Sequence, residues 1–359
     1  MAVAASPAPA GTSNSALDQL LERLVELGGT DLIVTVAAPP TGRVDGDLVA
    51  LFDVRLTPEQ TEAFVMSIMN ERQKAELERD RDVDFSINWQ SRARLRVNVF
   101  FQRGSYAAAL RLLPYEIPSP EVLGVPPVVM SWAEVHHGLV LVTGATGSGK
   151  STTLAALIAR INQTRPVHII TIEDPIEYVH RHGKAIVEQR EIGVDAASFA
   201  RSLRAAMREN PDVILVGEMR DLETIQIAIT AAETGHLVLG TLHANDTPQT
   251  IDRIVDVFPP EQQSLIKIQL SNALVGILSQ QLLPKIGGGR VASHEVLVAT
   301  PAVRNLIREG KTSQIRNVIQ TSGGVGMQTL EKSLNQLVAA GKITRELALA
   351  RAGNPVEIV

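Results

Sequence analysis

Residues 138–161 read GLVLVTGATGSGKSTTLAALIARI, and this stretch decides the fold. The apolar run at 139–143 predicts a buried strand, residues 144–151 match G-x-x-x-x-G-K-[ST], and residues 152–161 continue as a helical run. Glycines in such a loop let backbone N–H groups surround phosphate oxygens at the positive end of a helix. Because strand, loop and helix follow in this order, we interpret the stretch as a nucleotide-binding loop rather than a chance glycine-rich match.

The loop residues predict particular contacts to a nucleotide. Lys150 is expected to reach the β- and γ-phosphates, and Ser151 is expected to ligate Mg²⁺. We therefore predict that a nucleotide and Mg²⁺ bind here. The predicted nucleotide-binding residues are Gly144, Ala145, Thr146, Gly147, Ser148, Gly149, Lys150, Ser151 and Thr152.

Further apolar runs at 168–172, 213–216 and 236–241 alternate with amphipathic helices, which predicts an α/β domain with a parallel sheet. Acidic residues follow two of these runs: Glu218 after 213–216, and a cluster from Glu173 to Glu177 after 168–172. Ligands of open α/β sheets bind at the carboxyl ends of the strands, so one of these acids could serve as general base, and Glu218 could hold the Mg²⁺ water shell. Considered alone, each of these acids could instead belong to a solvent-exposed acidic turn without a catalytic role.

The residues alone leave two other sets of side chains open. His236 and His243 bracket the run at 237–242; histidine titrates near neutral pH and can sense a phosphate, but the spacing by itself favours a structural role. Several arginines lie on or after a predicted strand in the first third of the chain. They are Arg92, Arg94, Arg96, Arg103 and Arg111. They form either a solvated basic face or arginine fingers directed at the triphosphate.

Composition and the positions of prolines and turn residues divide the chain into four parts. Residues 1–14 are rich in Ala, Pro and Ser and are predicted to be disordered, and residues 15–112 to form a small α+β domain. In that domain Thr57-Pro58-Glu59 opens a helix and residues 102–104 form the turn of a strand pair. Five prolines place a linker at 113–128. Residues 129–359 are predicted to form the α/β domain that carries the nucleotide-binding loop, mainly helical beyond residue 300.

Charge and composition exclude several classes of protein. The chain has 34 Lys+Arg against 39 Asp+Glu and 3% aromatic residues, which argues against a nucleic-acid-binding surface. It has no cysteine, which excludes disulfide scaffolds and thiolate metal sites. No apolar run approaches the roughly 20 residues of a membrane span, so we expect a cytoplasmic protein that meets a membrane only through partners.

Several longer stretches resemble a known superfamily. GATGSGKSTTLAAL, TIEDPIEYVH, VILVGEMRDLETIQIAITAAETGHLVLGTLH and IDRIVDVFP are similar, in that order, to the Walker A, Asp-box, Walker B and His-box regions of the type II/IV secretion ATPases. KIGGGRVASHEVLVATPAVRNLIREGK and GMQTLEKSLNQLVAAGKIT narrow the resemblance to the PilT family of type IV pilus retraction ATPases. That family's AIRNLIRE motif is matched here except for Val303 in the place of Ile.

The resemblance implies a fold, an assembly and a set of site residues. It implies a PAS-like N-terminal domain, a RecA-like P-loop ATPase domain and a homohexamer that retracts pili, with ATP between the domains. Carried over residue by residue, Glu177 is the Asp-box catalytic acid, Glu218 is the Walker B acid that ligates Mg²⁺ with Ser151, and both His236 and His243 take part in catalysis. Arg96 in LRVNVF and Arg111 in LRLLP match arginines of the family, which favours arginine fingers.

The family also implies partners and leaves alternatives. An inner-membrane pilus platform protein and a PilU-type paralogue are the expected partners, at the cytoplasmic face of the pilus base. A PilU-like accessory subunit is one alternative. An assembly ATPase is another, although such relatives usually carry further N-terminal domains and a four-cysteine zinc motif that this chain lacks. The first domain departs from the family pattern at two places. The family's SDLH is replaced by Thr30-Asp31-Leu32-Ile33, and the turn at 102–104 is one residue shorter than the corresponding turn of the family.

Overall fold

A computed structural model describes residues 15–44, 46–90, 92–113 and 116–359 of the chain. It divides into two compact units, Met1–Tyr115 and Glu116–Val359, which we describe separately. The predicted disorder at 1–14 lies outside the described residues.

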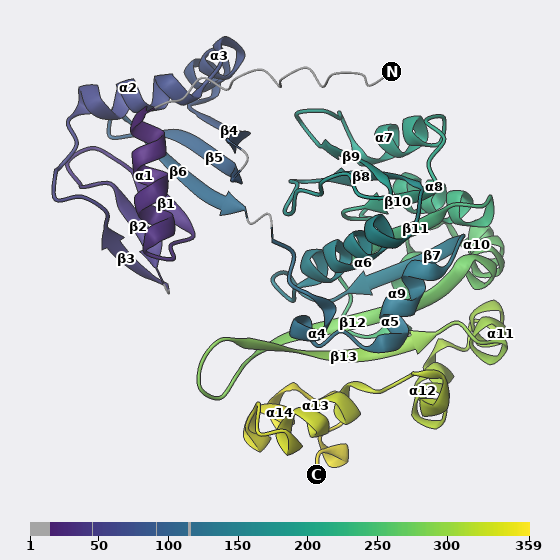
Figure 1. Cartoon of the computed structure of the whole chain (residues 1–359). Helices are drawn as coiled ribbons and strands as arrows, with labels where there is room; N and C mark the ends of the chain where they lie inside the picture. Colours follow the sequence, from purple (N-terminus) through teal and green to yellow (C-terminus); the bar gives the residue numbers. More distant parts are fainter. Residues whose placement is uncertain (1–14, 45, 91, 114–115) are drawn as a thin grey trace, which may run out of the picture. The chain divides into compact units, whose positions relative to one another are not determined.

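The first unit is an antiparallel sheet with three helices (Figure 1). The strand order is β3-β2-β1-β6-β5-β4, and every neighbouring pair is antiparallel. In chain order the elements are α1 (Ser15–Glu26), β1 (Asp31–Val34), β2 (Thr41–Val44), β3 (Asp47–Ala50), α2 (Pro58–Ile68), α3 (Glu71–Asp80), β4 (Asp82–Trp89), β5 (Ala93–Gln102) and β6 (Ser105–Leu113).

Alternation along β5 separates a core face of this sheet from a polar face. Leu95 and Val97 are buried with leucines of α1 and residues of α2 and α3, whereas Arg96 between them is exposed on the other face. Two predicted boundaries in this unit are confirmed. Thr57 caps α2 in a capping box with Gln60, and β5 turns into β6 through Arg103 and Gly104, both with positive φ.

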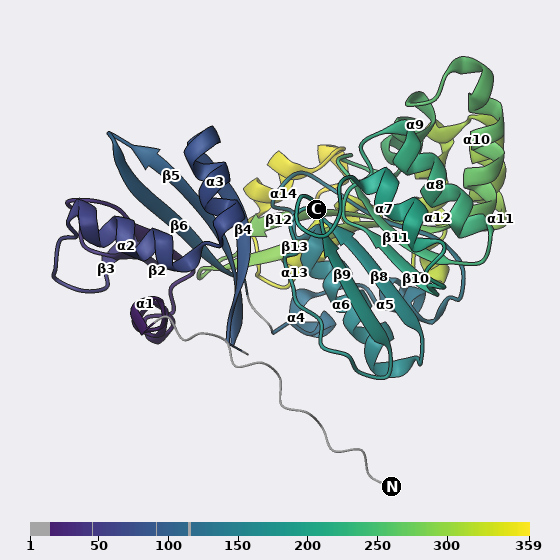
Figure 2. The same cartoon turned by 90° about the horizontal axis from the view of Figure 1, so that it is seen from above.

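The second unit is built on a seven-stranded sheet of order β13-β12-β7-β11-β10-β8-β9 (Figures 1 and 2). All pairs are parallel except β12 with β13. The elements up to β13 are α4 (Pro120–Leu123), α5 (Pro127–Ser131), η1 (Trp132–Glu134), β7 (Gly138–Thr143), α6 (Lys150–Thr164), β8 (His168–Glu173), β9 (Ile186–Glu191), α7 (Phe199–Ala206), β10 (Val213–Val216), α8 (Leu222–Glu233), β11 (Leu237–Leu242), α9 (Thr247–Asp256), α10 (Pro260–Ala273), β12 (Leu274–Pro284) and β13 (Arg290–Val298).

Helices cover both faces of this sheet, which explains why its central strands β7, β10 and β11 are fully buried and mostly apolar. Val140 and Val142 of β7 pack with α6, α5 and η1, whereas Leu139 and Leu141 pack in the core formed with α7, α8, α9 and α10. The predicted parallel α/β domain is confirmed. Residues 116–128 lie inside the predicted linker, but they contain α4 and the start of α5. They also contribute to the core that Val140 and Val142 form with α6. The connection between the two units is therefore shorter than the linker predicted from the prolines.

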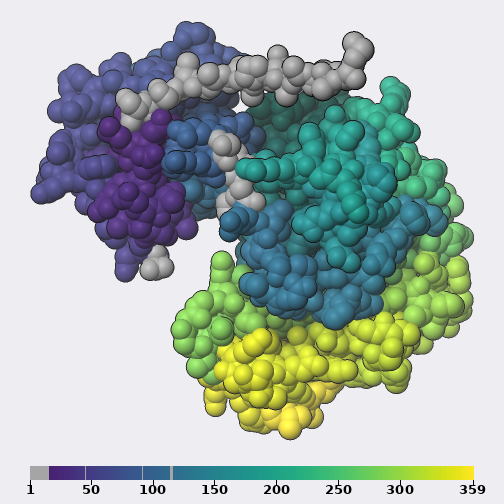
Figure 3. Space-filling view, viewed as in Figure 1, coloured from purple at the N-terminus to yellow at the C-terminus, as the bar shows by residue number. Residues whose placement is uncertain are grey.

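The chain ends in a helical part, as its sequence predicts. It comprises α11 (Pro301–Glu309), η2 (Thr312–Gln314), α12 (Ile315–Thr321), η3 (Gly323–Val325), α13 (Leu330–Ala339), α14 (Arg345–Arg351) and η4 (Pro355–Glu357). Helices α13 and α14 form a separate small core with the β12–β13 hairpin, in which Leu283, Leu334 and Ala348 are buried. In the space-filling view the light green hairpin lies against these yellow helices (Figure 3).

Candidate functional site

The phosphate-binding loop joins the carboxyl end of β7 to the first residue of α6 and depends on glycine. Gly144, Gly147 and Gly149 have φ values of 142°, 77° and 88°, which disfavour residues with a Cβ. A Cβ on Gly144 would lie 2.3 Å from the Gln280 carbonyl oxygen, and one on Gly149 would lie 2.7 Å from Gln280 Nε2. Two of the three glycines are therefore required both by backbone conformation and by the close approach of β12.

Gln280 holds this loop from the neighbouring strand. Its buried side chain donates from Nε2 to the Ser148 carbonyl (2.6 Å), and its Oε1 accepts from the Thr153 hydroxyl (2.8 Å). The sequence analysis missed this residue because it lies far along the chain from the loop it supports. The only available signal was a polar pair, Gln280-Gln281, inside an otherwise apolar strand.

The side chain of Lys150, the first residue of α6, reaches back to the start of the loop. Its Nζ donates to the carbonyl oxygens of Gly144 (2.9 Å) and Ala145 (3.0 Å). Burial lowers the pKa of this ammonium, and the charges of Glu218 and Glu177 offset the effect only in part. The site therefore has a cation that a phosphate would stabilise further.

Glu218 follows β10 and is kept ionised by two basic neighbours. Arg220 Nη2 donates to Glu218 Oε2 (2.7 Å), and His243 Nε2 lies 3.1 Å from Glu218 Oε1. Burial favours the neutral acid, but the hydrogen bond from Arg220 and the charges of His243, Arg220 and Lys150 outweigh it and lower the pKa of Glu218. An ionised carboxylate at the end of this strand is a hard oxygen donor suited to Mg²⁺.

The few oxygen ligands near the loop fit a Mg²⁺ ion whose other ligands are phosphates and water. Across the described residues, no group of three or more His, Asp or Glu side chains forms a metal site. Mg²⁺ is commonly bound by one or two protein oxygens together with phosphates and water. The Ser151 hydroxyl at the start of α6 and the Glu218 carboxylate match that pattern.

Glu177, the predicted Asp-box acid, and Glu173 of the same acidic cluster have different environments. Glu173 at the end of β8 is half-buried, its Oε1 accepts from the Thr171 hydroxyl (2.6 Å) and from Gln189 Nε2 (3.0 Å), and burial raises its pKa. Glu177 is exposed, and its charge acts on Lys150. Glu177 is thus exposed, as Asp174 is, whereas the carboxylate of Glu173 is held between β8 and β9.

The two histidines lie at opposite ends of β11. His243 follows the carboxyl end and contacts Glu218 beside the loop. His236 precedes the amino end, about 20 Å away for six strand residues. At that end the backbone N–H of His236 donates to the Ala231 carbonyl and closes the turn after α8. The same carbonyl oxygen lies 3.0 Å from His236 Nδ1. The structure therefore does not bring His236, a predicted catalytic residue, to the loop of its own unit.

The two predicted arginine fingers lie side by side in the first unit. Arg96 of β5 is paired with Arg111 of β6 on the polar face of the sheet, and both side chains are exposed. Arg111 Nε lies 2.8 Å from Oδ1 of Asp31, its partner on β1. Their action on a nucleotide stays a prediction.

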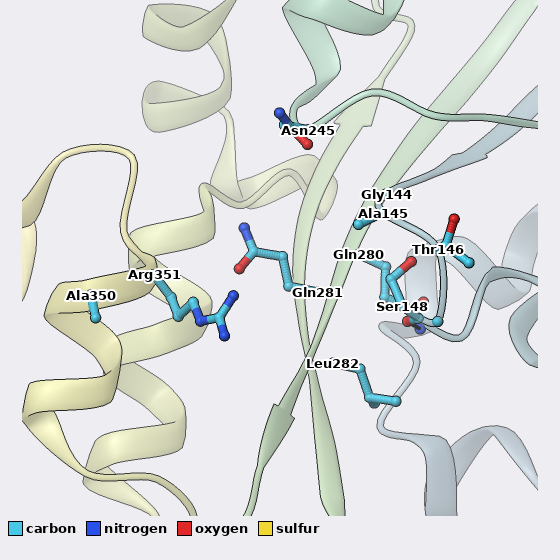
Figure 4. Close-up of a pocket in the computed structure, with 11 residues that line it drawn as sticks. Gly144, Ala145, Thr146, Ser148, Asn245, Gln280, Gln281, Leu282, Ala350 and Arg351 are labelled. Atoms are coloured by element: carbon cyan, nitrogen blue, oxygen red, sulfur yellow. Dashed lines mark hydrogen bonds between the residues drawn. The ribbon is translucent and has the colours of Figure 1, made fainter.

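A pocket of about 400 Å³ opens beside the loop, on the side of β12 (Figure 4). Its residues come from the loop, from β12, from the segment after β11 and from α14. They are Gly144, Ala145, Thr146, Gly147, Ser148, Asn245, Gln280, Gln281, Leu282, Ala350 and Arg351.

A parallel sheet with this loop after a central strand, and with carboxylates after two neighbouring strands, defines a RecA-like P-loop ATPase domain. Comparison with known proteins agrees. The family described as "Type II/IV secretion system protein" matches residues 65–288. The chain is 49% identical to the type IV pilus retraction ATPase PilT of Pseudomonas aeruginosa over 339 residues, 94% of this chain and 98% of that protein. It therefore belongs to the PilT family of pilus retraction ATPases, within the type II/IV secretion ATPases.

Two further comparisons refine this assignment. The type IV pilus ATPase PilU of Pseudomonas aeruginosa is 42% identical over 93% of this chain and 88% of its own length. The crystal structure of the pilus retraction motor PilT with bound ADP matches with a TM-score of 0.90 and 52% identity, over 95% of this chain and 98% of that one. Within the described residues, no helix is both long and apolar enough to cross a bilayer.

Proposed function

We propose that this chain is a Mg²⁺-dependent ATPase that powers the retraction of type IV pili as a homohexamer. One observation carries the proposal: Lys150 and the ionised Glu218, which His243 contacts, meet at a phosphate-binding loop in which a Cβ at Gly144 or Gly149 would collide with Gln280. The relatives named for pilus retraction support the biological task, since the chain aligns with nearly all of PilT. The greater identity with PilT than with PilU favours the motor over the accessory subunit.

In this proposal each residue has a separate role in hydrolysis. Lys150 and the backbone N–H groups of the loop hold the β- and γ-phosphates. Mg²⁺, held by Ser151 and Glu218, would offset phosphate charge when bound. Glu177 accepts a proton from the water that attacks the γ-phosphorus, while the bond from that phosphorus to the ADP oxygen breaks. His243, in contact with Glu218, senses whether the γ-phosphate is present.

The remaining predicted residues act outside this set. Arg96 and Arg111 supply positive charge to the triphosphate, an effect worth about 10³–10⁵ in rate for arginine fingers generally. His236 lies too far along β11 to act on the nucleotide of its own unit, so any part that it plays in turnover is indirect.

Purified enzyme tests the chemistry. Lys150→Ala is expected to abolish Mg²⁺-dependent ATP hydrolysis, whereas Lys342→Ala, at an exposed lysine, leaves it intact. Glu177→Gln and Glu218→Gln are expected to keep ADP binding and lose turnover. Activity that survives Lys150→Ala would refute the assignment of the loop. Loss of ADP binding in both glutamine variants would show that the acids are structural.

Cells test the direction of work. Deletion of the gene is expected to give hyperpiliated cells without twitching, restored by the wild-type gene and not by the Lys150→Ala variant. Bald cells would instead indicate an assembly ATPase. Retraction that persists in the deletion strain, or restoration by the Lys150→Ala variant, would indicate an accessory subunit of the PilU type.

The assembly and its partners are tested separately. The mass in solution is expected to be six times the 38.7 kDa of one chain. We further propose that the hexamer binds an inner-membrane platform protein of the pilus, with a PilU-type paralogue as a second partner, at the cytoplasmic face of the membrane. Cross-linking in cells is expected to recover the platform protein; recovery of ribosomal or DNA-bound complexes alone would contradict the proposal.

A further inference from the structure

We infer that the pocket beside the loop binds the nucleoside end of the nucleotide, and that Arg351 of α14 holds the base and ribose there. The inference rests on the proposed ATPase function and deepens it. It assigns a ligand-binding role to the last residue of α14, in a part of the chain that the motif analysis left without one.

The order of the strands sets the direction in which the nucleotide extends. The loop follows β7, and Glu218, His243 and Glu177 follow β10, β11 and β8, all on one side of it. These residues must surround the γ-phosphate if they act in hydrolysis. The nucleoside, at the other end of the triphosphate, then leaves the loop on the opposite side, where β12 lies next to β7.

The pocket on that side has a suitable size and chemistry. Its volume of about 400 Å³ lies within the range of about 300–1,000 Å³ typical of small-molecule sites. Leu282, Ala145 and Ala350 give it apolar walls, and the side-chain amides of Asn245 and Gln281 face it. A purine nucleoside needs this combination, because its ring faces are apolar and its edge and ribose carry donors and acceptors.

Arg351 is positioned as an anchor for such a ligand. Its guanidinium extends from α14 toward Gln281 across the pocket (Figure 4). Within the described part of the chain, neither side chain has a hydrogen-bond or ion-pair partner, so both are available to a ligand. A guanidinium plane can stack on a purine and donate to a ribose hydroxyl. The helix that carries it is held by Ala348 in the core shared with Leu283 of β12.

Nucleotide affinity of the full chain tests this inference. Arg351→Ala is expected to raise the Kd for ADP and the KM for ATP about tenfold, with kcat at saturating ATP unchanged. The affinity for inorganic tripolyphosphate, which lacks a nucleoside, is expected to stay the same. Arg345→Ala, at the first residue of α14 and outside the pocket, is the matched control and is expected to match the wild type.

A second variant guards against a folding defect. Ala350→Leu narrows the pocket without removing a charge and is expected to weaken ADP and spare tripolyphosphate in the same way. Equal loss of ADP and tripolyphosphate in Arg351→Ala would mean that the arginine contacts phosphates, which overturns the inference. So would unchanged ADP affinity in both variants. A wild-type chain that binds no ATP would refute the proposed function instead, so the two failures are distinguishable.

Discussion

Replacing Gln280 by methionine tests whether β12 shapes the phosphate loop. Methionine keeps the length of the side chain and removes its donor and acceptor, which leaves the Ser148 carbonyl and the Thr153 hydroxyl without their partner. A buried polar group without a partner costs about 1–3 kcal/mol, so two such groups predict a loss of about 2–6 kcal/mol in unfolding free energy. The Thr153 hydroxyl can instead donate to a backbone carbonyl one helical turn earlier, so we expect the loss in unfolding free energy to lie at the lower end of this range.

Thermal unfolding and ADP titration measure the effect. For a unit of this size about 1 kcal/mol shifts Tm by about 2–4 °C, so a fall of at least about 4 °C is expected. ADP binding is expected to weaken as well, because the Ser148 carbonyl belongs to the loop. Gln262→Met, at an exposed glutamine of α10, is the matched control and is expected to leave both quantities unchanged.

The double variant gives the sharper result. Thr153→Val removes one of the two hydrogen bonds by itself, and the losses from Gln280→Met and Thr153→Val are expected to be less than additive when combined. Full additivity would mean that the two side chains do not interact. A Gln280→Met protein with wild-type Tm and wild-type ADP affinity would refute the view that this glutamine holds the loop.

Three further changes test other parts of the second unit. Gly144→Ala is expected to lower Tm and ADP affinity more than Gly147→Ala, because a Cβ at Gly144 meets the Gln280 carbonyl at 2.3 Å whereas Gly147 has open space; equal effects in a side-by-side melt would contradict this. Burial lowers the pKa of His294 to about 4 from 6.5, so its stabilising effect is complete above pH 6.5 and is lost as pH falls toward 4. That loss is about 3 kcal/mol, and denaturant titrations at several pH values should show a flatter profile for His294→Gln. Arg304 donates to three carbonyls at the ends of α10 and β13, so Arg304→Met is expected to cost about 2–4 kcal/mol in chemical denaturation, and an unchanged midpoint would exclude that capping role.

The sequence predicted the parts of the site whose signals are local. The strand, loop and helix around Lys150 are contiguous, and the strands before Glu173 and Glu218 are short apolar runs because both faces of the sheet are covered. The contact between Glu218 and His243, by contrast, depends on the pairing of β10 with β11, which no local signal predicted. The contiguous strand, loop and helix and the apolar strands required no knowledge of long-range pairing.

The parts that were missed depend on pairings between distant residues. Gln280 contacts Ser148 across a register between β12 and β7 that no local pattern encodes. His236 was grouped with His243 because both flank one apolar run, but an extended strand of six residues carries its ends about 20 Å apart. The prolines at 120 and 127 indicated a linker, yet each begins a short helix, where a missing N–H has no cost.

Strand β12 connects the loop to the helical end of the chain. Consecutive residues of a strand point to opposite faces. The side chain of Gln280 therefore contacts the loop, while that of Gln281 lines the pocket together with Arg351. Two residues beyond Gln281 on the same strand, Leu283 is buried against α13 and α14. Strand β12 therefore contacts both the phosphate loop and the C-terminal helices. The retraction-family segment at 302–309 follows directly after β13, the antiparallel partner of this strand, and its Arg304 joins α11 to the end of α10. Through β12 and β13, the pocket that we propose for the nucleoside is thus linked by hydrogen-bonded strands to the segment that resembles the retraction-associated motif of the PilT family.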